Sequence, residues 1–277
     1  MIRNAQLNDA ESLYRLAQIL NTTNLPAALP DIREILGLTC ASFEGKIGHP
    51  DDGLYVFVLV DDLSGLVIGS SQVIACHGTP ELPHMFFQVE DSSLQLGFDT
   101  DGYTEIGGLI LDPDYRHVPQ RLGRALSLIR FKFIQMHASL FKERLIAELL
   151  PPMANDDSPL WKALGAHFTN LSYHEADHLS RKDKKFIEDV FPREPIPFDS
   201  LPREAQAVIG QVGDGSKPAS HILKQLGFRY DHRVDPFDGG PHFEMRTSDL
   251  PPIELQGSVS FEKAFEPGAV FRYGLAL

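Results

Sequence analysis

The chain has 277 residues, of which 43% are apolar and 23% are charged, proportions that exclude wholesale disorder and provide enough apolar side chains for a core. The 38 acidic and 25 basic side chains give a formal charge of −13, which argues against a dedicated nucleic-acid-binding protein because phosphate neutralisation needs a basic face. The longest apolar run, residues 54–60, is too short to cross a bilayer, and the N-terminus has no apolar signal core. We therefore expect a cytoplasmic protein.

The N-terminal region reads as a strand followed by two helices. Residues 1–5 predict a short strand, and Asn8 followed by Glu11 has the spacing of a capping box at the start of a helix. Apolar side chains at helical spacing between Ile32 and Phe43 predict the second helix.

A hairpin is predicted next. Residues 54–60 are β-branched and aromatic, residues 61–65 have the composition of a turn, and residues 66–77 supply the partner strand. The polar stretch 78–102, which is punctuated by glycine and proline, predicts a short strand and a long loop. Residues 103–111 then predict a further strand.

The rest of the chain continues this alternation of strands and helices. Ser158 has the pattern of a helix N-cap, and Gly165 and Gly227 have the pattern of glycines that end helices. The predicted elements are a helix over 120–139, a strand over 144–149, a helix over 159–164, a helix over 218–226 and a strand over 228–234.

This order of elements predicts an α+β fold of layered α/β type. Its sheet would be mixed and mostly antiparallel, with helices flanking it, and the C-terminal half from about residue 170 would be an elaboration. No Gly/Ser-rich linker divides the chain, so we expect one domain over residues 1–250. The Pro-rich point at 250–252 begins a C-terminal tail, residues 251–277.

The segment 109–125 carries the clearest chemical signal. It joins a strand to a helix, where free N–H groups and the helix dipole form an anion cradle. Gly123 would let the backbone approach a ligand, and Arg116, Arg121 and Arg124 add positive charge. A pyrophosphate suits this arrangement, although an ordinary tight strand-to-helix turn has the same pattern. No phosphate loop and no Gly-x-Gly-x-x-Gly is present, so nucleotide hydrolysis and dinucleotide redox chemistry are poorly supported.

The pattern Gln120-x-x-Gly123-x-Ala125 resembles the acyl-CoA signature of the GNAT acyltransferase superfamily. Several stretches between about residues 103 and 244 are similar, in the same order, to the arginine N-succinyltransferase family. They are Leu111-Asp-Pro-Asp-Tyr-Arg116, Ser158-Pro-Leu-Trp-Lys-Ala-Leu-Gly165, Glu175-Ala-Asp177, Glu204-Ala-Gln-Ala-Val-Ile-Gly-Gln-Val212, Gly227-Phe-Arg-Tyr230 and Val234-Asp-Pro-Phe-Asp-Gly-Gly-Pro241.

The resemblance implies a GNAT-like fold and an acyl-CoA-dependent N-acyltransferase of arginine catabolism. Succinyl-CoA would be a co-substrate rather than a permanently bound cofactor, and the α-amino group of L-arginine would attack its thioester directly. No metal, nucleic acid or membrane is implied, and the chain would assemble with copies of itself or with a related chain. The residues expected to bind acyl-CoA are Leu109, Ile110, Leu111, Arg116, Gln120, Arg121, Leu122, Gly123, Arg124 and Ala125.

The sequence departs from the family at the residue regarded as its proton donor. After Gln211-Val212 the family has a histidine, whereas this chain has Gly213. Either the chemistry needs no such group or another serves, and the possible substitutes are Tyr230, His221, His232 and His242. We take Glu105, Tyr230 and His232 as the catalytic candidates.

Recognition of a cationic amino acid requires carboxylates. Glu105 lies within an apolar strand, while Asp238 and Glu244 flank two glycines that permit close approach, so these three are the substrate-binding candidates. The alternative to an active enzyme is an altered family member that acts as a binding or structural subunit, or that uses another acyl donor or amine acceptor.

Two further patterns have other interpretations. His174-Glu-Ala-Asp-His178 matches the His-Glu-x-x-His motif of zinc peptidases, but no convincing third ligand follows, so a zinc hydrolase is a distant alternative. The basic run 181–185 is most often a solvated helix face, and the alternative is contact with a CoA phosphate.

Overall fold

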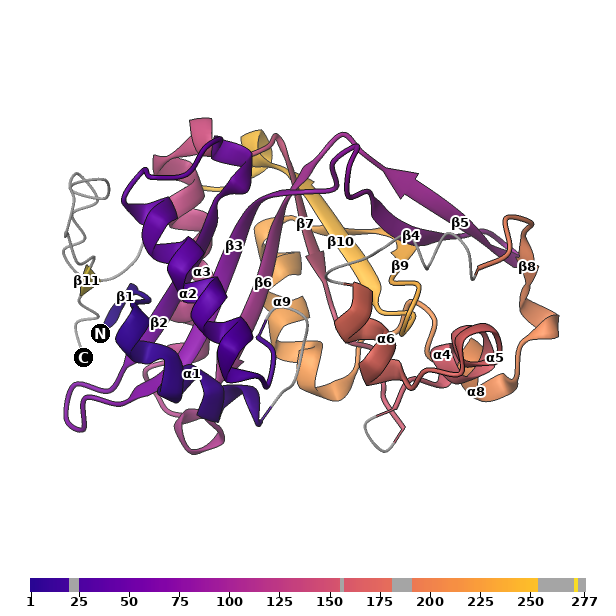
Figure 1. Cartoon of the computed structure of the whole chain (residues 1–277), viewed down its shortest axis with the longest axis horizontal. Helices are drawn as coiled ribbons and strands as arrows, with labels where there is room; N and C mark the ends of the chain where they lie inside the picture. Colours follow the sequence, from indigo (N-terminus) through magenta and orange to yellow (C-terminus); the bar gives the residue numbers. More distant parts are fainter. Residues whose placement is uncertain (20–24, 155–156, 181–190, 254–271, 274–277) are drawn as a thin grey trace. The chain divides into compact units, whose positions relative to one another are not determined.

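The computed structural model describes residues 1–19, 25–154, 157–180, 191–253 and 272–273. The chain forms two compact units (Figure 1). Unit 1 contains Met1–Cys76, Tyr103–Leu145 and Thr247–Leu277, and unit 2 contains His77–Gly102 and Ile146–Arg246. Whether residues 1–250 act as one domain stays a prediction.

The strands of unit 1 follow the order β11-β1-β2-β3-β6. They are β1 (Ile2–Asn4), β2 (Leu54–Val60), β3 (Val67–His77), β6 (Tyr103–Leu111) and β11 (Arg272–Tyr273). The hairpin β2–β3 is antiparallel, as its sequence predicts, and β1 pairs antiparallel with β2. Strand β6 continues the sheet beside β3, where the Thr104 hydroxyl donates to the Ala75 carbonyl and the Ser70 hydroxyl to the Gly108 carbonyl.

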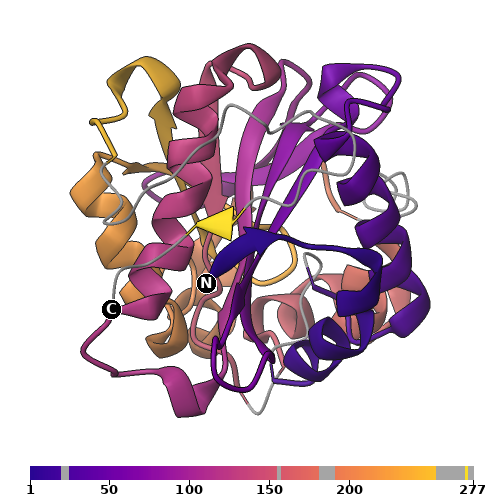
Figure 2. The same cartoon turned by 90° about the vertical axis from the view of Figure 1, so that its left-hand side faces the viewer.

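Helices cover both faces of this sheet (Figure 2). Helices α1 (Ala10–Ala17) and α2 (Leu29–Phe43) place Leu13, Leu16, Ile32 and Leu36 in a buried cluster with Val56 and Val58 of β2. Helix α3 (Leu122–Met136) packs on the other face of β2, where Phe133 contacts the rings of Tyr55 and Phe57. The alternation of side chains along β2 therefore supplies both cores.

Unit 2 contains strands in the order β7-β10-β9-β4-β5-β8, and β7 begins at the boundary with unit 1. They are β4 (His84–Val89), β5 (Ser93–Asp99), β7 (Arg144–Glu148), β8 (Ile196–Pro197), β9 (Arg229–Val234) and β10 (Pro241–Arg246). The pairs β4–β5, β4–β9, β5–β8 and β9–β10 are antiparallel.

Short helices pack against this second group of strands. They are α4 (Pro159–Ala163), α5 (Gly165–Thr169), α6 (Tyr173–Ser180), α8 (Arg203–Gln206) and α9 (Lys217–Leu226). Trp161 of α4 stacks on Phe237 with ring centroids 5.0 Å apart, and both rings belong to a core that includes Phe87 of β4 and Leu94 of β5. Unit 2 therefore has a hydrophobic core of its own, while the elaboration from about residue 170 stays a prediction.

The layered α+β class is confirmed, but three local predictions are wrong. Residues 78–102 form two paired strands, β4 and β5, rather than one strand and a long loop. Asn8 is not the cap of the first helix, because the capping box joins Gln6 and Asp9 around the 3-10 turn Leu7–Asp9. Gly165 does not end α4 but begins α5.

Candidate active site

Strand β6 has an irregular backbone where the resemblance places the acyl-CoA contact. Gly108 has φ +58°, and a Cβ there would lie 2.9 Å from Gln72 Cγ, so position 108 is suited to glycine alone. Arg130 of α3 donates from Nη1 to the Gly107 carbonyl at 3.0 Å. Leu109 and Leu111 are half-buried and Ile110 is buried. Arg130 therefore holds the backbone of the strand at Gly107, while the half-buried Leu109 keeps partial contact with solvent.

Arg130 holds this strand without an acidic partner. Its side chain is 3% exposed and also donates to the carbonyl and hydroxyl oxygens of Ser127, while no carboxylate of the described residues lies within ion-pair distance of it. Burial lowers the pKa of Arg130 to about 9. We therefore regard Arg130 as a positioning residue for β6.

The entry to α3 leaves backbone donors open to solvent. Arg121 is the N-cap and has a left-handed backbone with φ +51°, and the first helical N–H bonds come from Arg124 and Ala125 to the Arg121 carbonyl. The N–H groups of Leu122 and Gly123 precede those bonds, and residues 122–125 are only half-buried. A Cβ at Gly123 would meet only Leu111 Cδ2, at an ordinary 3.6 Å. Packing within the protein therefore does not require glycine at this position.

Positive charge surrounds this helix entry. Arg116, Gln120 and Arg121 are exposed, and Arg116 is oriented by donation from Nε to the Leu111 carbonyl at 3.0 Å. The nearby Asp112 carboxylate is paired with Arg15 at 2.6 Å, and this hydrogen bond lowers the pKa of Asp112. Arg15 neutralises the negative charge of Asp112. The arginines that follow therefore give the helix entry a net positive charge that is suited to phosphate groups.

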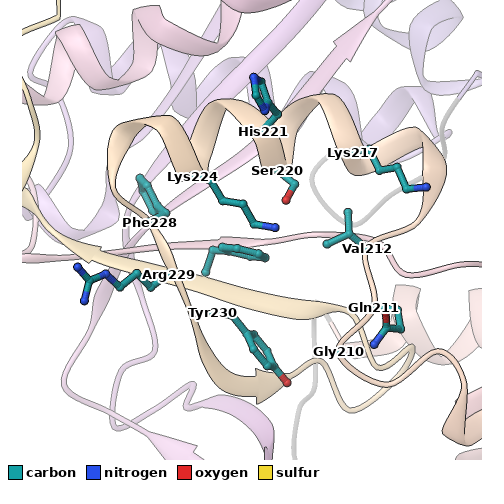
Figure 3. Close-up of a pocket in the computed structure, with 11 residues that line it drawn as sticks. Gly210, Gln211, Val212, Lys217, Ser220, His221, Lys224, Phe228, Arg229 and Tyr230 are labelled. Carbon is teal, nitrogen blue, oxygen red and sulfur yellow. The ribbon is translucent and has the colours of Figure 1, made fainter.

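Unit 2 has a cavity of about 710 Å³ between α9, β9 and the segment 210–212 (Figure 3). Ser220 and Lys224 point from α9 toward the strands, whereas His221 points away. Tyr230 is half-buried, and burial raises its pKa to about 12. Its hydroxyl faces Gly210, where φ is +69° and a Cβ would lie 2.8 Å from Tyr230 Oη. Glycine at 210 therefore leaves room for this hydroxyl.

His232 lies beside Tyr230, with ring centroids 5.0 Å apart. It is exposed, has a left-handed backbone with φ +62°, and accepts a hydrogen bond at its carbonyl from Gln88 Nε2. His242, another possible substitute, is fully buried, and burial lowers its pKa to about 3. Of these residues, Tyr230 and His232 form the accessible pair.

The candidate carboxylates lie in different places. Glu105 is buried on β6 of unit 1, together with the predicted acyl-CoA residues. Asp238 is buried in unit 2, where its Oδ1 accepts from the Gly240 N–H at 2.7 Å and its Oδ2 accepts from the Tyr173 hydroxyl at 3.3 Å. Burial raises the pKa of Asp238 to about 7. Glu244 is half-buried on β10, opposite Arg229 of β9.

Sequence reasoning missed a group of histidines and carboxylates in unit 2. His84 Nε2 lies 2.9 Å from Glu148 Oε1, and His242 Nε2 lies 3.6 Å from the same oxygen. Two sets of three, His77–His84–Glu148 and Glu148–Asp235–His242, have donor atoms close enough to hold a metal ion. Their members come from separate strands and a turn, so no spacing in the sequence reveals them.

The remaining sequence patterns add no acyl-transfer group. The His-Glu-x-x-His segment lies on α6, where Glu175 accepts from the N–H and hydroxyl of Ser172. These bonds lower the pKa of Glu175 and account for it as a helix-capping residue. The side chain of His178 and the basic run 181–185 lie outside the described residues, as does most of the tail 251–277.

No helix among the described residues combines the length and apolarity needed to span a bilayer. The family model described as "Arginine N-succinyltransferase beta subunit" matches residues 1–251. An arginine N-succinyltransferase of Photorhabdus laumondii is 32% identical over 279 residues, which cover 95% of this chain and 80% of that protein. A Yersinia pestis protein of the same name is 32% identical over 267 residues, covering 90% and 75% of the two chains.

A solved structure agrees with these sequence relatives. Subunit AI of the arginine/ornithine succinyltransferase of Pseudomonas aeruginosa superposes with a TM-score of 0.74 at 25% identity, over 93% of this chain and 82% of that one. The predicted GNAT-type acyltransferase fold is thereby confirmed. The chain belongs to the arginine N-succinyltransferase family and is an acyltransferase.

Proposed function

We propose that this protein transfers the succinyl group of succinyl-CoA to the α-amino group of L-arginine. The observation that carries the proposal is the entry to α3, where the half-buried Leu122 and Gly123 precede the first helical hydrogen bonds and the exposed Arg116 and Arg121 lie in the connection from β6. The names of the relatives support a succinyl donor and an arginine acceptor. We also propose a cytoplasmic location and assembly with copies of itself or a related chain, since the solved relative is a subunit.

We assign the diphosphate of the coenzyme to the N–H groups of Leu122 and Gly123, which precede the first helical hydrogen bonds, and to Arg116 and Arg121. The helix dipole and the guanidinium groups both favour an anion there, and a glycine without a packing role at 123 lets a phosphate approach the backbone. We assign the thioester to the half-exposed backbone near Leu109, whose N–H would stabilise the oxyanion as it forms.

The reaction joins the amine nitrogen to the thioester carbonyl carbon and breaks the carbon–sulfur bond. The α-ammonium group of arginine must first lose a proton to solvent, and the nitrogen loses a second proton after it attacks. The departing thiolate gains one proton, giving N2-succinylarginine and CoA. Tyr230 and His232 are the proposed proton-transfer groups in unit 2, and Glu105 is the candidate on β6. A tyrosine whose pKa lies at about 12 is protonated at neutral pH, so Tyr230 is suited to donating a proton.

The cationic side chain of the acceptor requires carboxylates. Asp238 is the first of the proposed carboxylates. Burial raises its pKa, and a bound guanidinium would favour its charged form. Glu105 and Glu244 complete the proposed set. One observation favours the second candidate function, a binding or structural subunit, because Gly213 stands where the family resemblance places a histidine.

A thiol-release assay with the full chain separates these functions. Succinyl-CoA, acetyl-CoA and free CoA are first titrated by calorimetry, and thiol release is then followed with arginine, ornithine, lysine and glutamate. We expect succinyl-CoA to bind more tightly than acetyl-CoA and arginine to give the fastest release. Binding of CoA esters without thiol release from any amine would overturn the enzyme and leave the binding subunit.

Variants then test the proton-transfer assignment. Tyr230→Phe and His232→Ala should each lower kcat by about 100-fold, the size typical of a lost general acid or base, while succinyl-CoA affinity stays unchanged. The matched control is His49→Ala, an exposed histidine in unit 1. Wild-type kcat in both Tyr230→Phe and His232→Ala would remove this pair from the proposal.

A further inference from the structure

We propose that Glu148, Asp235 and His242 of unit 2 form a binding site for a divalent transition-metal ion. One ligand atom from each residue lies within 4.8 Å of the other two. The residues come from the end of β7, the turn after β9 and the start of β10, so the fold of unit 2 alone assembles them.

The first line of support is the state of His242. It is 0% exposed, and neither ring nitrogen has a hydrogen-bond partner among the described residues. Leaving buried polar atoms unpaired carries a large desolvation penalty, so such a group requires an explanation. Because Nε2 lies 3.6 Å from Glu148 Oε1, the imidazole is directed at a carboxylate without hydrogen-bonding to it.

The second line of support is the irregular backbone pairing around His242. The register of β9 with β10 shifts between Pro241 and Phe243, which face Val234 and Tyr230, so three β9 residues stand opposite His242. His232, one of these three, has the left-handed backbone. A bulge of this kind re-aims the side chain at its position. His242 therefore lies opposite a distorted stretch of β9, and its Nε2 is 3.6 Å from Glu148 Oε1.

The third line of support is the orientation of the carboxylates. Asp235 Oδ1 accepts the N–H groups of Phe237 and Asp238, at 2.7 and 3.0 Å, which fixes the side chain and leaves Oδ2 for a further ligand. Glu148 is 29% exposed and Asp235 is half-buried, so an ion can enter from solvent. The site thus combines a rigid buried ligand with a path for entry.

The donor set selects the class of ion. One imidazole and two carboxylates suit zinc and the neighbouring first-row ions, whereas magnesium and calcium prefer oxygen ligands alone. In a tetrahedral zinc site with bonds of about 2.1 Å, neighbouring ligand atoms lie about 3.4 Å apart. The 3.6 Å between His242 Nε2 and Glu148 Oε1 is close to that spacing. Three protein ligands leave a fourth position for water.

Zinc binding to the full chain tests the site. The protein is treated with chelator and dialysed. It is then titrated with ZnCl₂ alone, once by calorimetry and once in competition with a chromophoric chelator. CoCl₂ is added to a separate sample to follow ligand-field absorption. We expect one Zn²⁺ per chain and visible Co²⁺ bands that Zn²⁺ removes. Absence of saturable binding to the wild-type chain would overturn the proposal, and no acyltransferase substrate is needed for this result.

Variants locate the ion. Glu148→Gln keeps the shape of the side chain and should weaken Zn²⁺ binding by about 100-fold, and His242→Ala should do the same. The exposed His221→Ala is the matched control, and His77→Ala tests the neighbouring set of ligands. Both controls should bind as the wild type does. If His242→Ala does not fold, Glu148→Gln and the Co²⁺ spectrum decide, and loss of binding in His77→Ala alone would overturn the assignment.

Discussion

The α-carbon of Gly213 faces the carbonyl oxygen of Pro151 so closely that a Cβ at position 213 would lie 2.5 Å from that oxygen. The Gly213 N–H donates to the Leu150 carbonyl at 3.0 Å, and its own carbonyl accepts the Lys217 N–H at the start of α9. The position where the family resemblance places a histidine is therefore packed against main chain. The backbone around position 213 leaves no room for a side chain. Replacing Gly213 with histidine would therefore not restore the family's proton donor without moving the main chain.

The first prediction is that Gly213→Ala destabilises unit 2 by about 1–3 kcal/mol, the usual effect of forcing a methyl group into occupied space. Gly213→His should be at least as destabilising and should not raise thiol release. Gly215→Ala is the control, because Gly215 is exposed and a Cβ there would have nothing within 4 Å of it. Urea unfolding measures the differences. Equal midpoints for Gly213→Ala and the wild type would contradict the packing described above.

Much of the fold is predictable because local patterns agree with the final packing. The all-apolar residues 54–60 form β2, residues 103–111 form β6, and Gly227 ends α9 with φ +106°. These elements depend on side-chain periodicity or on the glycine backbone, which are visible in the sequence. The cofactor-binding candidates around Gly123 also lie within one strand-to-helix connection, so the sequence alone could propose them, and they stay a prediction.

The remaining features depend on contacts between distant residues. In β4 and β5 the buried Phe87 and Leu96 face each other across the pair, a pairing that the folded hairpin shows and the separate stretches do not. Gly165 begins α5 because the chain turns beneath Trp161, whose ring would meet a Cβ there at 2.3 Å. The sequence predicts no metal site because Glu148 and His242 are brought together only by the order of the strands in unit 2.

The second prediction concerns the coenzyme cradle. Gly123→Glu should weaken the affinity for succinyl-CoA by at least about 100-fold, because it puts a carboxylate where a phosphate is expected. The fold should survive, since a Cβ at this half-exposed position makes only an ordinary contact. Gly37→Glu is matched to it, as Gly37 is an exposed glycine of α2 whose added Cβ would have nothing within 4 Å. Calorimetry with unchanged affinity in Gly123→Glu would remove the cradle from the proposed function.

The third prediction is a pH dependence of stability caused by Asp231. Burial raises the pKa of Asp231 to about 6, although the Arg233 N–H and guanidinium oppose this shift. Between pH 3.8 and about 6 the folded protein therefore binds more protons than the unfolded chain, so this contribution to stability falls as pH rises through that window.

Asp231→Asn should remove that decline and be more stable than the wild type at pH 8, by at most about 3 kcal/mol. Chemical unfolding at pH 4, 5, 6 and 8 gives the slope for each protein. The exposed Asp199→Asn is the control and should retain the slope of the wild type. A wild-type slope in Asp231→Asn would show that another group causes the dependence.

The fourth prediction concerns Ser158, which links α4 to the turn after β9. Its buried hydroxyl accepts the Trp161 N–H at 2.9 Å and donates to the Phe237 carbonyl at 2.8 Å, beneath the stacked rings of the same two residues. Ser158→Ala removes both of these buried hydrogen bonds, so it should lower the free energy of unfolding by about 2–4 kcal/mol. Ser92→Ala, at an exposed serine in the turn between β4 and β5, should change the free energy of unfolding by less than about 0.5 kcal/mol.

Because Ser158 lies far from the proposed CoA residues in sequence and in a different unit, succinyl-CoA affinity of the folded variant should stay at the wild-type value. Urea midpoints that match for the two variants would show that the Ser158 hydroxyl does not hold α4 against this turn.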